Sequence, residues 1–323
     1  MPYAELWDST SLGSRLARCA LAPASWLYAL GWEAYASVYR LGLKRPAEPH
    51  RPVLCVGSRR VGGSGKSPLA LYVARVVRSL GRDCVLGCSG YGTSAEHGAR
   101  LAPEGPLRAA EWGDEPAMFR ALEPNIALVV GRDRVEAARL AHASHPDAVV
   151  VMDDGFQHLR LREHIAIVLE EAGGNRMCLP AGPYREPKSG LRRADLILPD
   201  GFRLAYGETR LEWPDGSAFG GEEAVVPLCA IARPEAFLAD LRALGLRLLE
   251  PVVMPDHGPL TQGNLFQRAQ PDAVIVTTLK DWVKLRDRPD AASRRIVIAQ
   301  RDARIEPEDE FRSWLAARIE PPV

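Results

Sequence analysis

Short runs of hydrophobic residues alternate with stretches of helical spacing between residues 49 and 200. The runs predict buried strands, because apolar residues follow one another without polar interruption. They cover residues 53–56, 84–87, 126–130, 148–152, 165–169 and 196–198. Alternation of strand and helix predicts a parallel sheet with helices on both faces. We therefore expect an α/β core lobe over residues 49–200.

The pattern changes after residue 200. Residues 201–222 combine Gly, Trp and Pro in short segments, which predicts a hairpin-like bridge. Beyond it, the spacing predicts a smaller α/β lobe over residues 223–323. Its expected strands are residues 225–231, 247–253, 273–278 and 295–298; its expected helices are residues 234–244, 261–269 and 308–317, with a short helix after Lys280-Asp281. We expect the ligand site in the cleft between the lobes.

The N-terminal region, residues 1–48, contains an aromatic segment with a helical pattern at residues 16–43. A signal peptide has a shorter apolar core and a small-residue cleavage site. The aromatic content and Glu33 argue against a transmembrane span. Trp26, Trp32 and several Tyr with basic flanks are typical of a helix in the membrane interface. The alternative is a helix packed on the protein's own core.

A glycine-rich segment connects the first predicted strand to the helix that follows. It consists of Gly62, Gly63, Ser64, Gly65, Lys66 and Ser67. A strand, a glycine turn, Lys-Ser and a helix form the layout of a phosphate-binding loop. The N–H groups of the turn and of the helix start can cradle phosphates. We expect Lys66 to reach the outer phosphates and the Ser67 hydroxyl to bind Mg²⁺, in a P-loop NTPase-like sheet.

Two positions depart from the usual pattern G-x-x-x-x-G-K-[ST]. Arg60 stands at the first glycine, so Gly62 and Gly63 are expected to supply the turn. Pro68 follows the Ser, where a missing N–H costs little in the first helical turn. The alternative is an ordinary Gly-rich turn between a strand and a helix. The G-G-S-G-K-S sequence in this context favours phosphate binding.

Two adjacent acids, Asp153 and Asp154, end the strand predicted at residues 148–152. A carboxylate at the tip of a buried strand beside a phosphate loop holds Mg²⁺ in such folds, directly or through water. A helix cap is the alternative, and we favour metal binding.

Two further residues have a candidate role and a simpler one. Asp114 precedes a helix, where it could be an N-cap. Arg134 follows the strand predicted at residues 126–130. An Arg at that place can clamp a phosphate bidentately, although such residues are more often solvated charges.

The composition narrows the class of protein. Lys plus Arg equal Asp plus Glu at 41 each, so the net charge is zero and nothing favours nucleic acid as a partner. The 6 Cys form no C-x-x-C pair and no zinc spacing, which predicts reduced, mostly buried thiols in a cytoplasmic protein.

Several separate motifs occur in a fixed order along the chain. They are V-G-G-S-G-K-S-P, G-D-E-P, D-D-G-F-Q-H, L-P-A-G-P-Y-R-E-P, I-A-R-P-E-A-F and P-D-H. In this order they resemble the tetraacyldisaccharide 4'-kinase family of lipid A biosynthesis. The resemblance extends from the aromatic N-terminal segment to Lys280-Asp281. D-D-G-F-Q-H and L-P-A-G-P-x-R-E-P are its specific motifs.

The resemblance implies a kinase on the cytoplasmic face of the bacterial inner membrane. It would transfer the γ-phosphate of ATP, with Mg²⁺, to the 4'-hydroxyl of a tetraacylated disaccharide 1-phosphate. The N-terminal helix would contact the membrane to reach this lipid. No nucleic acid and no protein partner are implied.

The same resemblance assigns roles to individual residues. Lys66 and Ser67 would hold phosphates and Mg²⁺, and Asp153 and Asp154 would hold or orient the metal. Asp114 would be the general base, and His257 would pair with it. The residues lining the site would be Arg134, His158 and Glu186.

The chain departs from the family's usual motifs at several positions. Gly258 stands where D-H-H has its second His, Ser89 where S-R-G-Y-G has Arg, Leu279 where T-E-K-D has Glu, and Ser58 where an Asn is common. Two alternatives follow: a divergent P-loop kinase or NTPase acting on another acceptor, or a weakly active paralogue that binds nucleotide or lipid.

Overall fold

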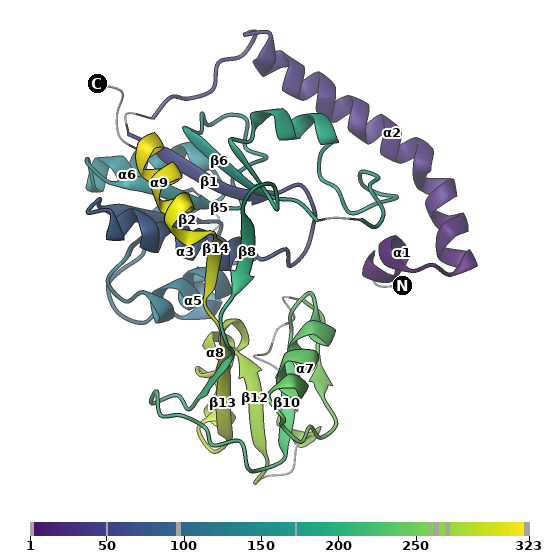
Figure 1. Cartoon of the computed structure of the whole chain (residues 1–323), viewed down its shortest axis with the longest axis vertical. Helices are drawn as coiled ribbons and strands as arrows, with labels where there is room; N and C mark the ends of the chain where they lie inside the picture. The colour runs from purple at the N-terminus through teal and green to yellow at the C-terminus, as the bar shows by residue number, and fades with distance from the viewer. Residues whose placement is uncertain are drawn as a thin grey trace. The chain divides into compact units, whose positions relative to one another are not determined.

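The computed structural model describes residues 3–49, 51–94, 98–171, 173–256, 258, 260, 265–268 and 272–319. The chain forms two compact units (Figure 1). Unit 1 comprises Met1–Gly87, Asp133–Leu204 and Ile305–Val323, and unit 2 comprises Cys88–Arg132 and Ala205–Arg304. Strands β8 (Arg203–Tyr206) and β14 (Ala303–Glu306) lie at two of the boundaries and pair in a two-stranded sheet.

Unit 1 is built on a parallel sheet. Its strands are β1 (Val53–Ser58), β2 (Cys84–Cys88), β5 (Val149–Asp153), β6 (Ile165–Leu169) and β7 (Leu196–Leu198), in the spatial order β2-β5-β1-β6-β7. Each adjacent pair is parallel. Every residue of β1, β2, β5 and β6 is buried. Burial on both faces is the reason why these strands read as nearly continuous hydrophobic runs.

Helices α3 (Lys66–Ser79), α6 (Arg134–Ser144) and α9 (Glu308–Ile319) belong to the same unit. Helix α3 packs against β1 and β5, and α6 packs against β5. The buried residues of α3 recur at helical spacing, among them Leu69, Val73, Val76 and Val77. The apolar stripe that the sequence shows is therefore the stripe that covers the sheet.

The carboxyl ends of β1 and β5 lie side by side. Val56 of β1 is opposite Asp153 of β5, and the two strands run in the same direction. Because open parallel sheets bind ligands beyond the carboxyl ends of their strands, this edge is the natural place for a site. The glycine-rich segment follows β1 there, and Asp154 follows β5.

Unit 2 contains a five-stranded sheet in the order β11-β10-β12-β13-β9. Its strands are β9 (Arg210–Glu212), β10 (Val225–Cys229), β11 (Val252–Val253), β12 (Val274–Thr278) and β13 (Arg295–Gln300). Four are parallel to their neighbours, and β9 pairs antiparallel with β13. Helices α7 (Pro234–Ala243) and α8 (Leu279–Leu285) and the 3₁₀ turns η3 (Leu265–Arg268) and η4 (Pro289–Ala291) complete this part.

The earlier segment of unit 2 carries an antiparallel pair, β3 (Arg100–Leu101) and β4 (Ala127–Val130). Between them lie α4 (Ala109–Trp112) and α5 (Asp114–Leu122). Both helices pack against α8, and α5 has the larger contact. This packing brings Asp114 to Lys280, although the two are far apart in the sequence.

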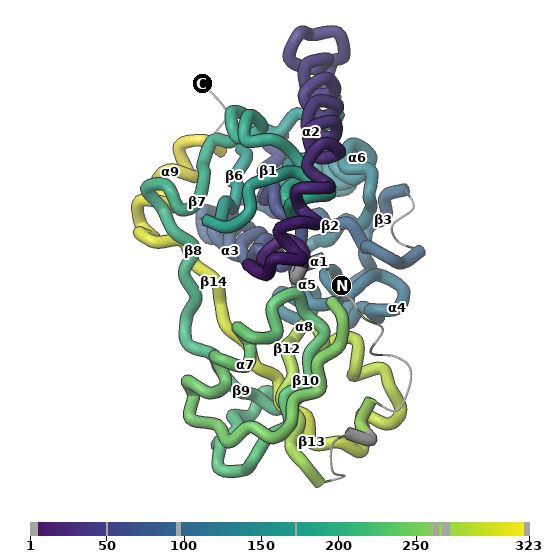
Figure 2. The backbone as a smooth tube through the Cα atoms, turned by 90° about the vertical axis from the view of Figure 1, so that its right-hand side faces the viewer, coloured from purple at the N-terminus to yellow at the C-terminus, as the bar shows by residue number. Residues whose placement is uncertain are grey.

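The N-terminal region of unit 1 consists of α1 (Tyr3–Asp8) and the long helix α2 (Leu12–Arg40). Ser11 caps α2, because its hydroxyl accepts a hydrogen bond from the Ser14 N–H. Figure 2 shows the end of α2 and the turn after it extending past the other elements of unit 1. In the part of the chain that the structure describes, we find no helix with the length and hydropathy to cross a bilayer.

The predicted α/β fold with a parallel-rich sheet is confirmed. Three local expectations differ from the structure. The strand expected at residues 247–253 is reduced to β11, because the preceding residues pair only through the isolated bridge between Val225 and Leu248. In the bridge at residues 201–222, β8 and β9 pair with β14 and β13 rather than with each other. The helix expected at residues 261–269 contains η3, and residues 261–264 and 269 lie outside the described residues.

The expectation of mostly buried, unpaired thiols agrees with the structure. Each Cys is free, Cys19 is exposed, and the others are buried.

Candidate active site

The glycine-rich segment takes the form of a phosphate loop. Helix α3 begins at Lys66, and Gly65 is its N-cap with a φ of 85°. Gly62 has a φ of 103°. Side chains other than glycine rarely adopt these left-handed values, so the two glycines allow the chain to turn directly from β1 into the helix. The first N–H groups of α3, a helix of 14 residues, face the end of this loop.

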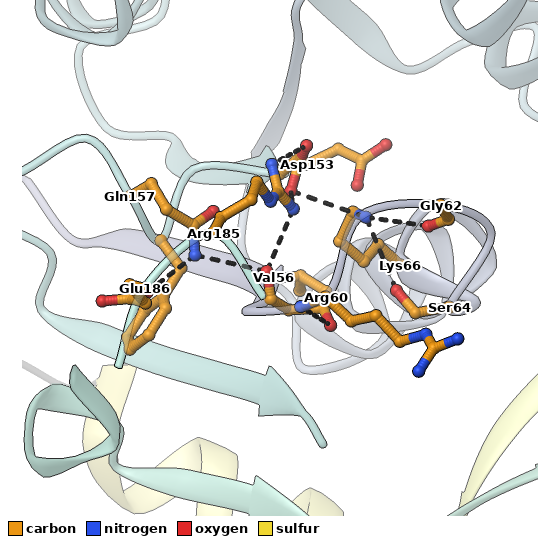
Figure 3. A network of polar contacts seen from close by, with 12 residues as sticks. Val56, Arg60, Gly62, Ser64, Lys66, Asp153, Gln157, Arg185 and Glu186 are labelled. Atoms are coloured by element: carbon orange, nitrogen blue, oxygen red, sulfur yellow. Dashed lines mark hydrogen bonds and ion pairs between the residues drawn. The ribbon is translucent and has the colours of Figure 1, made fainter. Parts of the chain in front are cut away.

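The Lys66 side chain folds back over the loop (Figure 3). Its Nζ lies 3.5 Å from the Gly62 carbonyl and 3.5 Å from Ser64 Oγ. It also lies 3.6 Å from Asp154 Oδ1. These contacts are long, which is typical of an ammonium group shared among several oxygens. Lys66 thus connects the loop after β1 with the acid after β5.

The two unusual positions of the loop have structural explanations. Pro68 is the third residue of α3, within the first turn, where no intrahelical bond needs its missing N–H. The Arg60 guanidinium turns to acids outside the loop, with NH2 2.6 Å from Asp8 Oδ2 and Nε 3.4 Å from Glu171 Oε2. The Arg60 side chain therefore points away from the turn, and Gly62 adopts the left-handed conformation that the turn needs.

A tight turn carries the two acids at the end of β5. Asp153 is the buried last residue of the strand, and Asp154 has a φ of 53°, an uncommon value for a residue other than glycine. A Cβ on Gly155 would lie 2.5 Å from Cys55 Sγ. Only glycine lets this turn pack so closely on β1. The glycine of the D-D-G motif is therefore dictated by the approach of the turn to the strand.

Asp154 binds a second cation besides Lys66. Arg185 donates from NH1 to Oδ2 at 2.9 Å and from NH2 to Oδ1 at 2.7 Å, and it also donates to the Ser58 carbonyl at 3.0 Å. Burial raises the pKa of Asp154, but Lys66 and Arg185 outweigh burial and lower that pKa to about 2. The carboxylate is therefore ionised at every physiological pH.

Arg134 and His158 flank the same turn. Arg134 is buried, and its NH2 donates to the Asp153 carbonyl at 2.6 Å. Burial and the Arg134 charge lower the pKa of His158 to about 4, although Asp154 and Asp133 act in the opposite direction. His158 is therefore a neutral imidazole at pH 7, able to accept or donate a hydrogen bond without a charge.

The acids and the loop hydroxyl fit a magnesium ion. Asp153, Asp154 and Ser67 offer carboxylate and hydroxyl oxygens, the ligands that Mg²⁺ prefers. No group of three or more His, Cys, Asp or Glu arranged to hold a metal occurs among the residues that the structure describes.

Glu186 lies at the centre of a buried network. Its side chain is fully buried, and it accepts hydrogen bonds from Gln157 Nε2 at 2.7 Å, Arg193 NH2 at 2.9 Å and Trp32 Nε1 at 3.2 Å. Burying a carboxylate requires hydrogen-bond donors, and these three side chains supply them. Glu186 thus fixes the backbone beside the site.

In unit 2, Asp114 is surrounded by lysines. It is the first residue of α5, and Gly113 is the N-cap, so the N-cap alternative for Asp114 is wrong. Lys280 Nζ lies 3.7 Å and Lys284 Nζ 3.9 Å from Asp114 Oδ2. The Asp114 side chain is 11% exposed. A nearly buried carboxylate is therefore held between two ammonium groups.

Asp281 anchors this cluster to the sheet of unit 2. It is fully buried, and Lys284 Nζ lies 2.9 Å from its Oδ1. Its Oδ2 accepts from the Ala230 N–H at 2.9 Å and from the Thr278 hydroxyl at 3.0 Å. The sequence predicted a short helix after Lys280-Asp281. In the structure both residues lie in the first turn of α8.

Acidic neighbours keep Lys280 charged. Burial lowers the pKa of Lys280, but Asp114, Glu115, Asp256 and Asp281 outweigh burial and raise that pKa. Lys280 is therefore an ammonium group at neutral pH. His257, the expected partner of Asp114, lies outside the described residues.

Comparison with known proteins identifies the family. Residues 17–320 match the sequence model of LpxK: Tetraacyldisaccharide-1-P 4'-kinase. The chain belongs to this family. The tetraacyldisaccharide 4'-kinase of Geobacter metallireducens is 34% identical over 313 residues, covering 84% of this chain and 89% of the relative. That of Halorhodospira halophila is 36% identical over 292 residues, covering 84% of this chain and 85% of the relative.

A solved structure of the 4'-kinase family has the same fold. The crystal structure described as the "apo" form of LpxK from Aquifex aeolicus in complex with ATP matches with a TM-score of 0.79. It is 24% identical, and the match covers 94% of this chain and 100% of that chain.

Sequence reasoning about this 4'-kinase family member missed four polar residues around the two acids. Arg185 binds Asp154, and Gln157 binds Glu186. Lys280 and Lys284 lie beside Asp114. Arg185 and Gln157 stand inside the two specific motifs, and this signal was available. Lys280 stands in the stretch compared with T-E-K-D but was given no role, and Lys284 gave no comparable signal, because its place beside Asp114 depends on the packing of α5 on α8.

Proposed function

We propose that the protein transfers the γ-phosphate of ATP to the 4'-hydroxyl of a tetraacyldisaccharide 1-phosphate in lipid A biosynthesis. One observation carries the proposal: in a member of the 4'-kinase family, Lys66 lies on the phosphate loop 3.6 Å from the strand-tip acid Asp154. Phosphoryl transfer depends mainly on positioning and charge neutralisation. Backbone N–H groups, a lysine and two acids at one sheet edge supply both.

In this proposal Ser67, Asp153 and Asp154 hold Mg²⁺. When bound, the ion would neutralise charge on the phosphates. Arg185 and Lys66 keep Asp154 ionised, as a ligand must be. Arg134 fixes the strand end from which both acids project. His158 lines the site as a neutral hydrogen-bond donor or acceptor. Glu186 holds the neighbouring backbone in place through its buried hydrogen bonds.

Asp114 is proposed as the general base. A sugar hydroxyl is a weak nucleophile, and a carboxylate that accepts its proton assists the attack. Lys280 and Lys284 hold this carboxylate by charge attraction. His257 would bond to Asp114 and orient it.

We further propose that α2 contacts the cytoplasmic face of the inner membrane. Leu12, Leu16, Trp26, Leu27 and Leu30 are each at least 62% exposed. They share one side of α2, since residues three, four, seven or eleven positions apart fall on one face of a helix. An exposed apolar stripe with basic flanks is typical of an interfacial helix.

Purified protein supplied with Mg-ATP and the tetraacyldisaccharide 1-phosphate should yield the 4'-phosphorylated lipid. Lys66→Ala is the matched negative control. ATP hydrolysis without the lipid product would favour the alternative of another acceptor, and nucleotide binding without turnover would favour the weakly active paralogue.

Replacing Leu27 and Leu30 together by Asp should reduce binding to vesicles of bacterial phospholipid by at least about tenfold, because each exposed Leu loses its burial in the acyl region. Leu244→Asp, an exposed Leu of unit 2, is the control. Unchanged vesicle binding by the double variant would contradict membrane contact through α2.

A further inference from the structure

The inward side of α2 is hydrogen-bonded to the loop that carries L-P-A-G-P-Y-R-E-P, residues 179–187. We call this segment the bridging loop. Three bonds join it to α2: Ala181 N–H to Ser25 Oγ at 2.8 Å, Tyr28 O–H to the Arg185 carbonyl at 2.7 Å, and Trp32 Nε1–H to Glu186 Oε2 at 3.2 Å. Ser25, Tyr28 and Trp32 are three and four positions apart, so they lie on one side of the helix.

The same bridging loop pairs with the start of the phosphate loop. Arg60 and Tyr184 form an antiparallel bridge. Two backbone bonds accompany it: Val61 N–H to the Pro183 carbonyl at 2.9 Å, and Arg185 N–H to the Arg59 carbonyl at 2.7 Å. The residues that enter the glycine turn are therefore held by the bridging loop as by a neighbouring strand.

Side chains of the bridging loop extend this connection to the acids. Arg185 binds both carboxylate oxygens of Asp154 and the Ser58 carbonyl. Glu186 binds Gln157 Nε2, which donates to the same Ser58 carbonyl at 3.2 Å (Figure 3). One continuous set of hydrogen bonds thus leads from α2 through the bridging loop to the phosphate loop and to the turn after β5.

We propose that Tyr28 and Trp32 are positioning residues for nucleotide binding, acting through the bridging loop. The inference rests on the proposed function, because it assumes that ATP binds to the phosphate loop. Glu186 is fully buried, so the loss of one donor leaves its charge less well satisfied and lets the loop relax. Helix α2 then has two separate sides. The outward side is apolar and exposed, and the inward side orders the nucleotide site.

The test compares two tryptophans of one helix. Trp32→Phe removes the Nε1 donor to Glu186, whereas Trp26→Phe alters a side chain that is 68% exposed. The full chain in detergent is titrated with ATP and Mg²⁺, without lipid, by calorimetry. Trp32→Phe should weaken ATP binding by about five- to tenfold, because part of the free energy of one hydrogen bond to a charged group is lost from the ordered loop. Trp26→Phe should bind ATP within about twofold of the wild type, as expected for an exposed site.

Tyr28→Phe provides an independent arm, since it deletes only the hydroxyl that donates to the Arg185 carbonyl. It should weaken ATP binding by about three- to fivefold. The assay with saturating lipid should show a raised KM for ATP with kcat unchanged. A purely structural role would lower Tm and the active fraction but leave the Kd of the folded protein unaltered.

The outcomes separate the two proposals. Wild-type Kd values for both Tyr28→Phe and Trp32→Phe would overturn the positioning role while leaving the kinase proposal intact. Lys66→Ala is the reference variant. If Lys66→Ala also binds ATP like the wild type, the phosphate-loop assignment fails, and the positioning role fails with it.

Discussion

The two acidic centres of the protein are held in different ways. In unit 1, Asp154 is gripped by Arg185 through two hydrogen bonds of 2.7 and 2.9 Å, and the surrounding backbone is fixed by the Glu186 network. In unit 2, Asp114 is flanked by Lys280 and Lys284 at 3.7 and 3.9 Å, beyond hydrogen-bond distance. A site fixed by a bidentate guanidinium suits a ligand of fixed shape. Asp114 is instead held by the Glu115 N–H, which donates to its Oδ1 at 3.0 Å, and by the charges of the two lysines. The difference predicts that changes in unit 1 affect nucleotide binding, whereas changes in unit 2 affect transfer.

The largest effect is expected for Lys66→Ala. The substitution removes the ammonium group from the phosphate loop, and transfer should fall by at least about 10³-fold because charge neutralisation carries most of the catalysis. ATP affinity should fall as well. Radiolabelled phosphate transfer and ATP titration of the same preparation check both. Activity near that of the wild type would remove the phosphate-loop assignment.

Asp114→Ala is expected to have the next largest effect, and only on transfer. Loss of a general base should lower kcat by about 10²- to 10⁴-fold. The Kd for ATP should stay within about twofold of the wild type, because a general base acts on the hydroxyl in the transfer step rather than on the bound nucleotide. Asp114→Asn keeps the shape of the side chain and should behave in the same way. A loss of ATP affinity as large as that of Lys66→Ala would abolish the distinction between the units.

Lys280→Met should lower kcat by about tenfold, because one charged group beside Asp114 typically contributes a few kcal/mol or less. Lys284→Met is the comparison. It also breaks the 2.9 Å contact with the fully buried Asp281, so it should lower Tm more than Lys280→Met does. Equal losses of Tm, with no change in kcat for either variant, would show that the lysines are structural only.

The smallest effect concerns the response of unit 1 to acid. The pKa of His158 is lowered to about 4 in the fold, against 6.5 ordinarily. Above pH 6.5 the residue is neutral in both the folded and the unfolded chain. As the pH falls from 6.5 to 4, the unfolded chain takes up the proton first, so folding loses at most about 3 kcal/mol. Thermal unfolding at several pH values should show this loss, and His158→Gln should remove it. An identical pH slope in the variant would assign the loss to other groups.

The sequence predicted the sheet of unit 1 well, because buried parallel strands leave continuous apolar runs and the D-D-G turn needs a glycine against Cys55. The layout of a strand, a glycine turn and a helix from Lys66 was equally clear, and even Pro68 fits its place in α3. The weaker predictions depend on contacts between distant segments. The sequence does not indicate that Arg60 pairs with Asp8, because this ion pair depends on the position of α1. The pairing of β8 with β14 likewise joins residues about 100 positions apart.

The candidate site shows the same limit. Lys66, Asp153 and Asp154 follow from local motifs, since each stands at a strand end. Arg185 bonds to Asp154 across 31 positions, and Lys280 lies beside Asp114 only because α5 packs on α8. Periodicity and spacing along the chain do not encode such encounters.

The proposed 4'-kinase activity is best tested by measuring the stoichiometry of the reaction. Purified protein is mixed with Mg-ATP and the tetraacyldisaccharide 1-phosphate, and ADP and 4'-phosphorylated lipid are quantified together by mass spectrometry. A 4'-kinase should form one phosphorylated lipid for each ADP, and Lys66→Ala should form neither product. ADP formed without phosphorylated lipid, or lipid phosphorylated at another hydroxyl, would contradict the proposed activity.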